Sequence, residues 1–579
     1  MKLQVVWFKR DLRWEDHAPL AAAVATGQPV VALLLHEPSL WAQPVYSNRH
    51  ACFEYESAAE LAATRPLLGR LVAQANNAYE SRETSKDAAA GRGTSNETTA
   101  ALGTSIDAAD GRGTSIDAAE GLGTSIDAAE GLGTSIDAAD GRGTSIDAAD
   151  GRNSLPFFYL AAEATEAFEA LEAFAGMPIG AVFSHQEIGI ETSFARDRLM
   201  KKWFRKRGIT WYESPYGSVR RGLKRRDDWN AHWNEVMFKE PLTMCDWERG
   251  QSWKPTASWI KWAEVKKVER PAREAGVAQT GGAAWGHRYL RSFVAGGRGR
   301  GYMAHISKPE GARNHCSRLS PYLAWGNLSL KQVVRNLAET RSGDHLAMRD
   351  ARAFASRLRW REHFIQKFES EPRMEFEHVN RGYNQQTFST SSAHLNAWKQ
   401  GQTGVPMVDA CMRSLNETGY LNFRMRAMLV SFGCHALNLN WKDLSAHLAQ
   451  QFLDFEPGIH YPQLQMQAAV TGVNTVRIYN PVKQAEEQDP HGAFIERWVP
   501  ELAPLPMPFR AAPWMLTEID CVGYGFQFGT DYPAPLVDLT TALRDARIRL
   551  YGAKKRPEVR AEKNRILEMH VAPQRKKRG

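Results

Sequence analysis

The first 216 residues alternate between short, almost wholly apolar runs and segments with helical spacing. LQVVWF (3–8) and PVVALLLHE (29–37) are the first two apolar runs, and DHAPLAAAVAT lies between them. Strands that are apolar on both sides are typical of a parallel sheet whose two faces are covered by helices. The alternation therefore predicts an N-terminal α/β domain, residues 1–216, with a doubly wound parallel sheet.

A repeat interrupts this pattern before it resumes with the strands PFFYLA, GAVFSHQEI and ITWYESP. From Thr84 to Arg152 a ten-residue unit recurs, ending in copies of TSIDAADGRG or TSIDAAEGLG. Each clean copy offers one isoleucine among small residues, which is too little apolar surface to offset the entropy of ordering it. We expect 84–152 to be a disordered surface insertion. The regular period leaves a β-solenoid open, and the Asp–Gly pairs leave a calcium site open.

Composition changes again after the last strand. Residues 217–285 are rich in Trp, Lys and Pro, and we interpret them as a connector between domains. Helical periodicity then dominates, which predicts an all-helical C-terminal domain over 286–551. The remaining residues, 552–579, are strongly basic and are expected to form a solvated, disordered tail. With 579 residues, the chain is too long for a single core, in agreement with two large domains.

The net charge of +8 is unevenly distributed. VRRGLKRRDDW (219–229) and the C-terminal QRKKRG concentrate cations, which favours nucleic acid over membrane as a partner, with solvated surface as the alternative. The six cysteines include no CxxC pair, so neither a zinc site nor a disulfide framework is indicated, and an iron–sulfur cluster would need distant cysteines. The apolar N-terminal run is only a strand long. We expect no signal peptide, no membrane span, and a cytoplasmic monomer.

The richest concentration of functional groups in apolar surroundings lies between Thr403 and Pro481. This stretch combines a helical hydrophobic period with two arginines in FRMR, two acids in LDFE and the polar–aromatic run HYPQLQMQ. Such a mixture predicts most of the lining of a flavin pocket. The glycines of GGRGRG (296–301) do not form a GxGxxG fingerprint, so a Rossmann-type nucleotide site is not indicated.

These blocks and their order resemble the photolyase/cryptochrome family. VVWFKRDLRWEDHAPLAAA is similar to the family's first strand and the turn after it, and NHCSRLSPYLAWGNLS to its phosphate-binding segment. RWREHF, TGVPMVDACMR, FRMR and RIYNPVKQ with FIERWVPEL resemble further blocks. The resemblance covers nearly the whole chain except the repeats and the tail. It implies FAD in the helical domain and room for a second, light-harvesting chromophore that the sequence does not identify.

The resemblance also implies how FAD is held. The hydroxyls of Ser317 and Ser320, with backbone amides, are expected to coordinate phosphate oxygens near a helix start; an N-cap is the alternative. Arg426 and Asp454 correspond to a family salt bridge beside the isoalloxazine ring, for which a structural ion pair is the alternative. The residues predicted to bind the cofactor are Tyr302, Ser317, Arg318, Leu319, Ser320, Arg361 (as a cation), Arg426, Asp454, Glu456 and His460.

Two features of the flavin surroundings depart from the family pattern. His460, or Tyr461 if the loop carries an insertion, falls where the family has Asn or Asp facing flavin N5. Of the family's three electron-carrying tryptophans, the sequence keeps Trp441 as the middle one. The outer position is Phe388, and the inner one is Leu464 or Gln465. Trp398, Tyr420, Tyr461 and Tyr479 are substitutes, with core packing as the alternative for each.

The predicted substrate pocket departs further. Trp360 keeps the aromatic position that packs on a flipped pyrimidine dimer, but the family's glutamate three residues earlier is Arg357. Phe423 replaces an asparagine, Tyr420 a tryptophan and Ala427 a methionine. The residues predicted to contact DNA are Arg357, Phe423, Gln467, Arg477 and Lys483, and those predicted to take part in catalysis are Trp360, His460 and Trp441.

The resemblance implies light-driven DNA repair, in which reduced FAD donates an electron to a flipped-out cyclobutane pyrimidine dimer. The rival function is that of a cryptochrome-type photoreceptor without repair activity, which the altered pocket favours. A third, repair of another lesion or of single strands, is compatible with the same changes.

Overall fold

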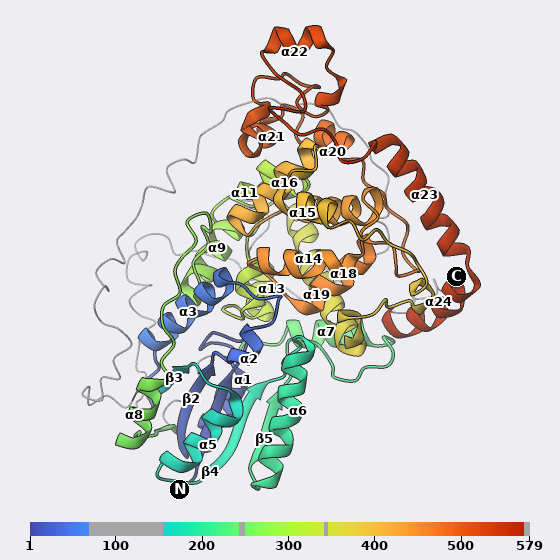
Figure 1. Ribbon diagram of the computed structural model, residues 1–579. Helices are drawn as coiled ribbons and strands as arrows, with labels where there is room; N and C mark the ends of the chain where they lie inside the picture. Colours follow the sequence, from blue (N-terminus) through green and yellow to red (C-terminus); the bar gives the residue numbers. More distant parts are fainter. Residues whose placement is uncertain (69–153, 243–248, 341–345, 572–579) are drawn as a thin grey trace, which may run out of the picture. The chain divides into compact units, whose positions relative to one another are not determined.

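The computed structural model describes residues 1–68, 154–242, 249–340 and 346–571 (Figure 1). The repeats at 84–152 lie outside the described residues, and so does our expectation about them. In the part of the chain that is described, no helix is long and apolar enough to cross a membrane.

The N-terminal part is built on a parallel sheet, as the alternation of apolar runs predicts. Its strands run in the order β3-β2-β1-β4-β5, and the short β6 pairs with β2. In β1, Val6 lies opposite Ala32 of β2 and Phe183 of β4. β1 and β2 are buried along their whole length, which requires cover on both faces of the sheet. The strands are β1 (Leu3–Phe8), β2 (Pro29–Leu35), β3 (Phe157–Leu160), β4 (Ile179–His185), β5 (Thr210–Ser214) and β6 (Gln251–Ser252).

The helices of this part and of the connector are short to medium in length. They are α1 (Ala18–Ala25), α2 (Pro38–Trp41), α3 (Asn48–Ala63), α5 (Ala164–Phe174), α6 (Glu191–Lys206), α7 (Trp229–Met237) and α8 (Ala257–Val265). The two helices α7 and α8 fall within the residues that we interpret as a connector.

Helices dominate the C-terminal part, so the fold class expected from the sequence is confirmed. The longest is α14 (Met348–Ser370), and five short elements are 3-10 or π turns. The elements are α9 (Ala283–Val294), α10 (Tyr302–His305), α11 (Pro309–His315), α12 (Ser320–Ala324), α13 (Leu330–Glu339), α14, η3 (Pro372–Glu375), η4 (Arg381–Tyr383), α15 (Ser392–Gln400), α16 (Pro406–Thr418), α17 (Phe423–Ser431), η5 (Phe432–Ala436), α18 (Trp441–Gln451), α19 (Pro457–Gln467), α20 (Pro481–Gln488), α21 (Ala493–Trp498), η6 (Pro500–Leu502), η7 (Pro513–Met515), α22 (Glu518–Tyr524), α23 (Leu539–Lys555) and α24 (Pro557–His570).

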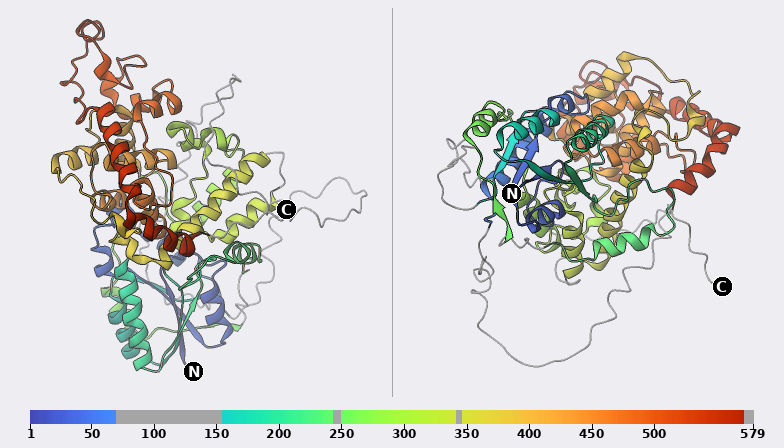
Figure 2. Two further views of the ribbon diagram at one scale, coloured as in Figure 1. Left: turned by 90° about the vertical axis from the view of Figure 1, so that its right-hand side faces the viewer. Right: turned by 90° about the horizontal axis from the view of Figure 1, so that it is seen from below.

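The turn after β1 joins the sheet to the helical part. The Arg10 guanidinium donates to the carbonyl of Phe455 at 2.5 Å, and the amide of Leu12 donates to the carbonyl of Trp325 at 3.2 Å. Gly326 (φ +71°) permits this approach, because a Cβ there would lie 2.2 Å from the Arg10 carbonyl oxygen. The helical part thus meets the carboxyl end of β1, and the left view of Figure 2 shows the helices beyond that end of the sheet.

The same turn contains a buried cluster of Asp11, His17 and His185. Nε2 of His17 and Nδ1 of His185 lie 2.9 and 2.6 Å from one carboxylate oxygen of Asp11. These are metal-ligand types within 4.8 Å of one another. However, Nδ1 of His17 accepts the amide hydrogen of Leu20 and caps α1, so a neutral ring carries its hydrogen on Nε2, which faces the Asp11 carboxylate at 2.9 Å. His185 is hydrogen-bonded to the same carboxylate, so each histidine of the cluster has a protein partner.

The expectation of a disordered basic tail over 552–579 is wrong for the residues that are described. α23 continues to Lys555, and α24 packs through buried Val559 and Ile566. The buried imidazole of His570 lies 2.8 Å from the carboxylate of Glu371. The error arises because the abundant charges conceal an apolar face with a seven-residue spacing. Residues 572–579 lie outside the description.

Candidate functional site

Arg426 and Asp454 form a bidentate ion pair. Nη1 and Nη2 of Arg426, on α17, lie 3.0 and 2.9 Å from the two carboxylate oxygens of Asp454, which precedes α19. Arg426 also donates to the carbonyl of Leu421 and lies 3.9 Å above the ring of Phe452. Burial opposes ionisation of Asp454, but the adjacent guanidinium outweighs it and lowers the pKa of the carboxyl. The side chain of Ser320 adds a further hydrogen bond to the same carboxylate.

A second buried pair joins α14 to the start of α19. Nη2 of Arg361 lies 3.0 Å from the carboxylate of Glu456 and 2.9 Å from the carbonyl of Leu323. The hydroxyl of Tyr216 lies near both ionic groups. The structure therefore pairs Arg361 with a protein carboxylate, whereas the sequence predicts it as a cation for the FAD phosphates. The physical reason is Gly458, where a Cβ would lie 2.8 Å from Cα of Ile365, so that α19 approaches α14 closely.

The segment that resembles a phosphate-binding loop has a special backbone. Arg318 adopts a left-handed conformation (φ +57°), and Gln279 holds it by donating to its carbonyl at 2.9 Å and accepting from its Nη2 at 2.9 Å. The guanidinium of Arg318 stacks on the ring of Tyr420 at 3.7 Å. Leu319 is buried, whereas Ser320 at the first position of α12 is exposed. Ser317 offers its carbonyl to Arg298 at 2.9 Å.

Three arginines lie around this segment, and their contacts indicate whether the segment fits an FAD diphosphate. Arg298, Arg313 and Arg318 form no ion pair with a carboxylate of the described residues, and Nε of Arg318 is buried without a hydrogen-bond partner. Burial and the neighbouring arginines lower the pKa of Arg298 and of Arg313 to about 10. Partly buried cations that repel one another are stabilised by an anion that offsets their charge. The cluster therefore fits a diphosphate, and sequence reasoning missed Arg298 and Arg313. Arg298 lies within GGRGRG, where only the glycines attracted attention.

Tyr302 lies in the core next to this cluster. Its ring packs against Phe293 at 5.6 Å and Phe354 at 5.9 Å, and burial raises the pKa of its hydroxyl. Tyr302 is 5% exposed, so its main contribution in this structure is to the packing of α9, α10 and α14.

His460 is held by α18. Its Nε2 lies 3.1 Å from the carbonyl oxygen of Ser445, which can only accept a hydrogen bond, so the neutral ring carries its hydrogen on Nε2 and leaves Nδ1 as an acceptor. Burial lowers the pKa of His460 to about 4, so the ring is neutral at pH 7. The hydroxyl of Ser445 bonds both His460 and the phenol of Tyr461. The three side chains form a hydrogen-bonded chain.

The aromatic residues considered for electron transfer lie in different surroundings. Trp441 is fully buried and donates its ring N–H to Nδ1 of His378 at 3.0 Å, and His378 stacks near Phe388 with ring centroids 6.1 Å apart. Trp398 is also fully buried and donates to the carbonyl of Leu429. Tyr461 is the candidate that lies next to His460, the residue predicted to face flavin N5, and their ring centroids are 5.3 Å apart.

The residues predicted to contact DNA divide into two groups. Trp360 and Phe423 are 44% and 47% exposed, and Arg357, Arg477 and Lys483 are exposed as well. Gln467, by contrast, is buried, because α19 turns it inward and its amide donates to Gln463. The structure therefore does not offer the side chain of Gln467 to a nucleic acid on the surface.

Comparison with known proteins identifies the type of domain in each part of the chain. Residues 354–551 match the family described as FAD binding domain of DNA photolyase, and residues 4–81 match that described as DNA photolyase. A cryptochrome DASH from Natronomonas pharaonis is 32% identical over 265 residues, which are 45% of this chain and 54% of that protein. A deoxyribodipyrimidine photo-lyase from Vibrio cholerae is 29% identical over 381 residues, which are 62% of this chain and 76% of that protein.

Among solved structures, an archaeal photolyase from Sulfolobus tokodaii with two FAD molecules has the same fold. Its TM-score is 0.62 at 20% sequence identity, and the match covers 95% of this chain and 100% of that chain. The chain spans about half the length of several curated relatives it matches, 54% and 49% in two of them.

The C-terminal helical part is therefore an FAD-binding domain of the photolyase type. The chain belongs to the photolyase/cryptochrome family. Its relatives include proteins named as photo-lyases and proteins named as cryptochromes.

Proposed function

We propose that this protein uses light to repair cyclobutane pyrimidine dimers in DNA, as a deoxyribodipyrimidine photo-lyase. The exposure of Trp360 and Phe423 carries this proposal. Both are large aromatic side chains on helices α14 and α17, which also bear the ion-pairing Arg361 and Arg426. Exposed aromatic rings beside a cofactor site suit flat bases that have been lifted out of a DNA strand.

The roles of the side chains follow from their chemistry. FAD, when bound, supplies the light-driven electron, so the chain needs no acid–base pair for the bond cleavage. Trp360 packs on the flipped dimer, and Arg357, Arg477 and Lys483 attract backbone phosphates. The Arg426–Asp454 pair and the neutral ring of His460 orient the isoalloxazine, while Arg298, Arg313 and Arg318 offset the charge of the diphosphate.

A cryptochrome-type photoreceptor without repair activity is the second candidate. It is favoured by Arg357, an exposed cation at the position where the resemblance to the family implies a glutamate. A cation there does not accept hydrogen bonds from pyrimidine N–H groups. The same replacement is compatible with a lesion other than the cyclobutane dimer or with a single-stranded substrate.

The deciding experiment uses purified, reduced protein illuminated with dimer-containing oligonucleotides, single- and double-stranded. Repair predicts loss of dimers in the light and none in the dark. Trp360→Ala is expected to weaken lesion binding by about tenfold or more, since stacking on a base contributes roughly 1–3 kcal/mol. Tyr212→Ala, which removes an equally exposed aromatic ring from β5, serves as the control. Intact dimers in both substrates after illumination would exclude repair of this lesion.

We also infer that the N-terminal domain carries a second chromophore and that the protein acts in the cytoplasm as a monomer. The Sulfolobus tokodaii photolyase with its two FAD molecules supports the first inference. Mass spectrometry of the chromophores extracted from the purified protein, with their molar ratio to the chain, tests it. A single flavin per chain and no other chromophore would contradict it.

A further inference from the structure

A cluster of basic side chains lies on the face of α14 that is turned toward the 217–228 segment and α24. The predicted flavin site does not include these side chains. Arg226 is 1% exposed, and its guanidinium lies 5.6 Å from the centre of the Trp229 ring. Its Nη1 and Nη2 make only long hydrogen bonds to His363, 3.3 Å to Nδ1 and 3.4 Å to the carbonyl. Its Nε is buried without a partner. Lys367 follows His363 by four residues, so both lie on one face of α14.

No carboxylate of the described residues contacts Arg226 or Lys367. The three nearby acids have other partners: Glu371 pairs with Arg373, Arg565 and His570, Glu369 accepts the amide hydrogen of Gly222, and Asp228 pairs with Arg220. Lys367 is 6% exposed, and its ammonium has no hydrogen-bond or ion-pair partner among the described residues.

A buried cation without an ion-pair partner is costly, and this cost lowers its pKa. Burial lowers the pKa of Arg226 to about 9, with Arg220 adding to the effect. Burial also lowers the pKa of Lys367 to about 8, although Glu371 partly opposes it. Burial and these two cations together hold the pKa of His363 well below its usual range.

We propose that Arg226, His363 and Lys367 form a binding site for a phosphate group. A guanidinium, an ammonium and an imidazole N–H together supply charge and several donors to a tetrahedral oxyanion. The ring of His363 lies 5.5 Å from that of Trp360, so the site is close to the aromatic residue assigned to the lesion. The phosphate is either the free ion or part of a DNA strand, and only the DNA source rests on the proposed function.

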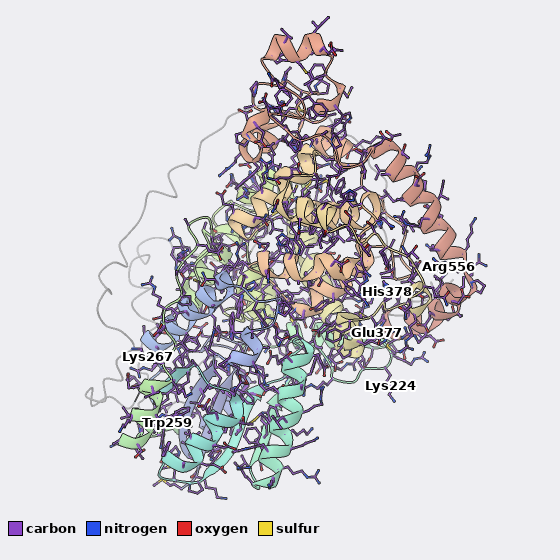
Figure 3. All side chains as sticks on the ribbon, viewed as in Figure 1. Lys224, Trp259, Lys267, Glu377, His378 and Arg556 are labelled. Carbon is purple, nitrogen blue, oxygen red and sulfur yellow. The ribbon has the colours of Figure 1, made fainter. Side chains whose placement is uncertain are left out.

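The first test compares thermal unfolding in phosphate and in chloride at pH 7 and equal ionic strength. Phosphate well above its dissociation constant is expected to raise the Tm of the wild-type protein by about 2 °C more than chloride does. Lys367→Met should lose this increment and should unfold in chloride at or above the wild-type Tm, because an unmatched buried cation is gone. Lys224→Met, whose side chain points outward from the same segment (Figure 3), should keep the increment.

The second test measures the affinity for a dimer-containing single-stranded oligonucleotide. A tenfold or greater loss of affinity in Lys367→Met, together with a loss of affinity in the wild type when phosphate competes, assigns the site to DNA. An unchanged affinity together with a lost phosphate increment assigns it to the free ion. Arg226→Gln repeats both measurements in case Lys367→Met does not fold. An increment that survives in both variants, or that is absent in the wild type together with unchanged DNA affinity, would overturn the proposal. Absence of photorepair alone would count against the proposed function and not against this site.

Discussion

At the residue scale, the flavin site depends on how each arginine is partnered. Arg426 and Arg361 each have a protein carboxylate, whereas Arg298, Arg313 and Arg318 have none among the described residues. The first two can therefore fix the geometry of helices around the cofactor without it, and the other three are positioned for an external anion. Arg361 therefore has a protein carboxylate as a partner, whereas its assignment to the FAD phosphates stays a prediction.

Replacing Arg426 by lysine keeps the charge but removes the two parallel hydrogen bonds to Asp454. We expect Arg426→Lys to lose most of its FAD during purification, and Asp454→Asn to lower the free energy of unfolding by about 3 kcal/mol, because a largely buried cation loses its partner. The ratio of flavin absorbance to protein and a denaturant titration measure the two effects. Arg198→Lys, in an exposed pair with Glu191, is the matched control. Full flavin content in Arg426→Lys would contradict the role given to this pair.

At the element scale, different faces of α14 make different contacts. One face carries Arg361 toward α19, another holds the connector through Glu362 and Gln366, and a third exposes Trp360. The hydroxyl and amide of Ser218 both lie 2.9 Å from the carboxylate of Glu362. Because these contacts fix the rotation of the helix about its axis, they also fix the direction in which Trp360 points.

The element α19 yields a prediction about electron supply. Tyr461 is hydrogen-bonded to Ser445, and its ring centroid lies 5.3 Å from that of His460. A phenol is far easier to oxidise than the phenyl ring of phenylalanine. We expect Tyr461→Phe to slow light-driven reduction of the bound FAD roughly tenfold. Bleaching of the oxidised flavin under illumination with an external reductant measures the rate, and Tyr212→Phe, at an exposed ring on β5, is the control. An unchanged rate in Tyr461→Phe beside a slowed rate in Trp441→Phe would make Trp441 the donor instead.

At the scale of the whole molecule, the flanks of the repeat insertion are close together. Leu67 and Ser154 form an antiparallel bridge, and the amide of Leu155 donates to the carbonyl of Pro66 at 2.9 Å. A short loop can therefore join them. Deleting 84–152 and closing the gap with a few glycines is expected to leave the flavin content and the Tm unchanged within about 2 °C. An insoluble or flavin-free product would show that the repeats contribute to the fold.

Buried histidines make the stability of the whole molecule depend on pH. Burial lowers the pKa of His50, His185, His435 and His460 to about 4, below the ordinary value of 6.5. Between pH 6.5 and 4 the unfolded chain therefore binds more protons than the folded one. The free energy of unfolding should fall as the pH is lowered through this window, by about 1.4 kcal/mol per pH unit for each histidine.

Denaturant midpoints at pH 7, 6 and 5 measure this dependence. His50→Gln should reduce the slope by the share of one histidine whatever it does to the stability at pH 7. A flat profile between pH 7 and 5 would mean that these rings are not buried in the neutral form.

The sequence by itself determined the features that depend on local pattern. The alternation of apolar runs specified a parallel sheet, helical periodicity specified the C-terminal part, and the resemblance of FRMR and LDFE to blocks of the photolyase/cryptochrome family implied the Arg426–Asp454 pair. Tertiary structure alone decided which distant groups converge. It placed Arg298 and Arg313 around Arg318, turned Gln467 inward and packed α24 against Glu371. It also left Arg226 and Lys367 with no ion-pair partner among the described residues. The reason is that burial and electrostatics depend on the packing of elements that are far apart in the chain. The periodicity of the sequence does not predict that packing.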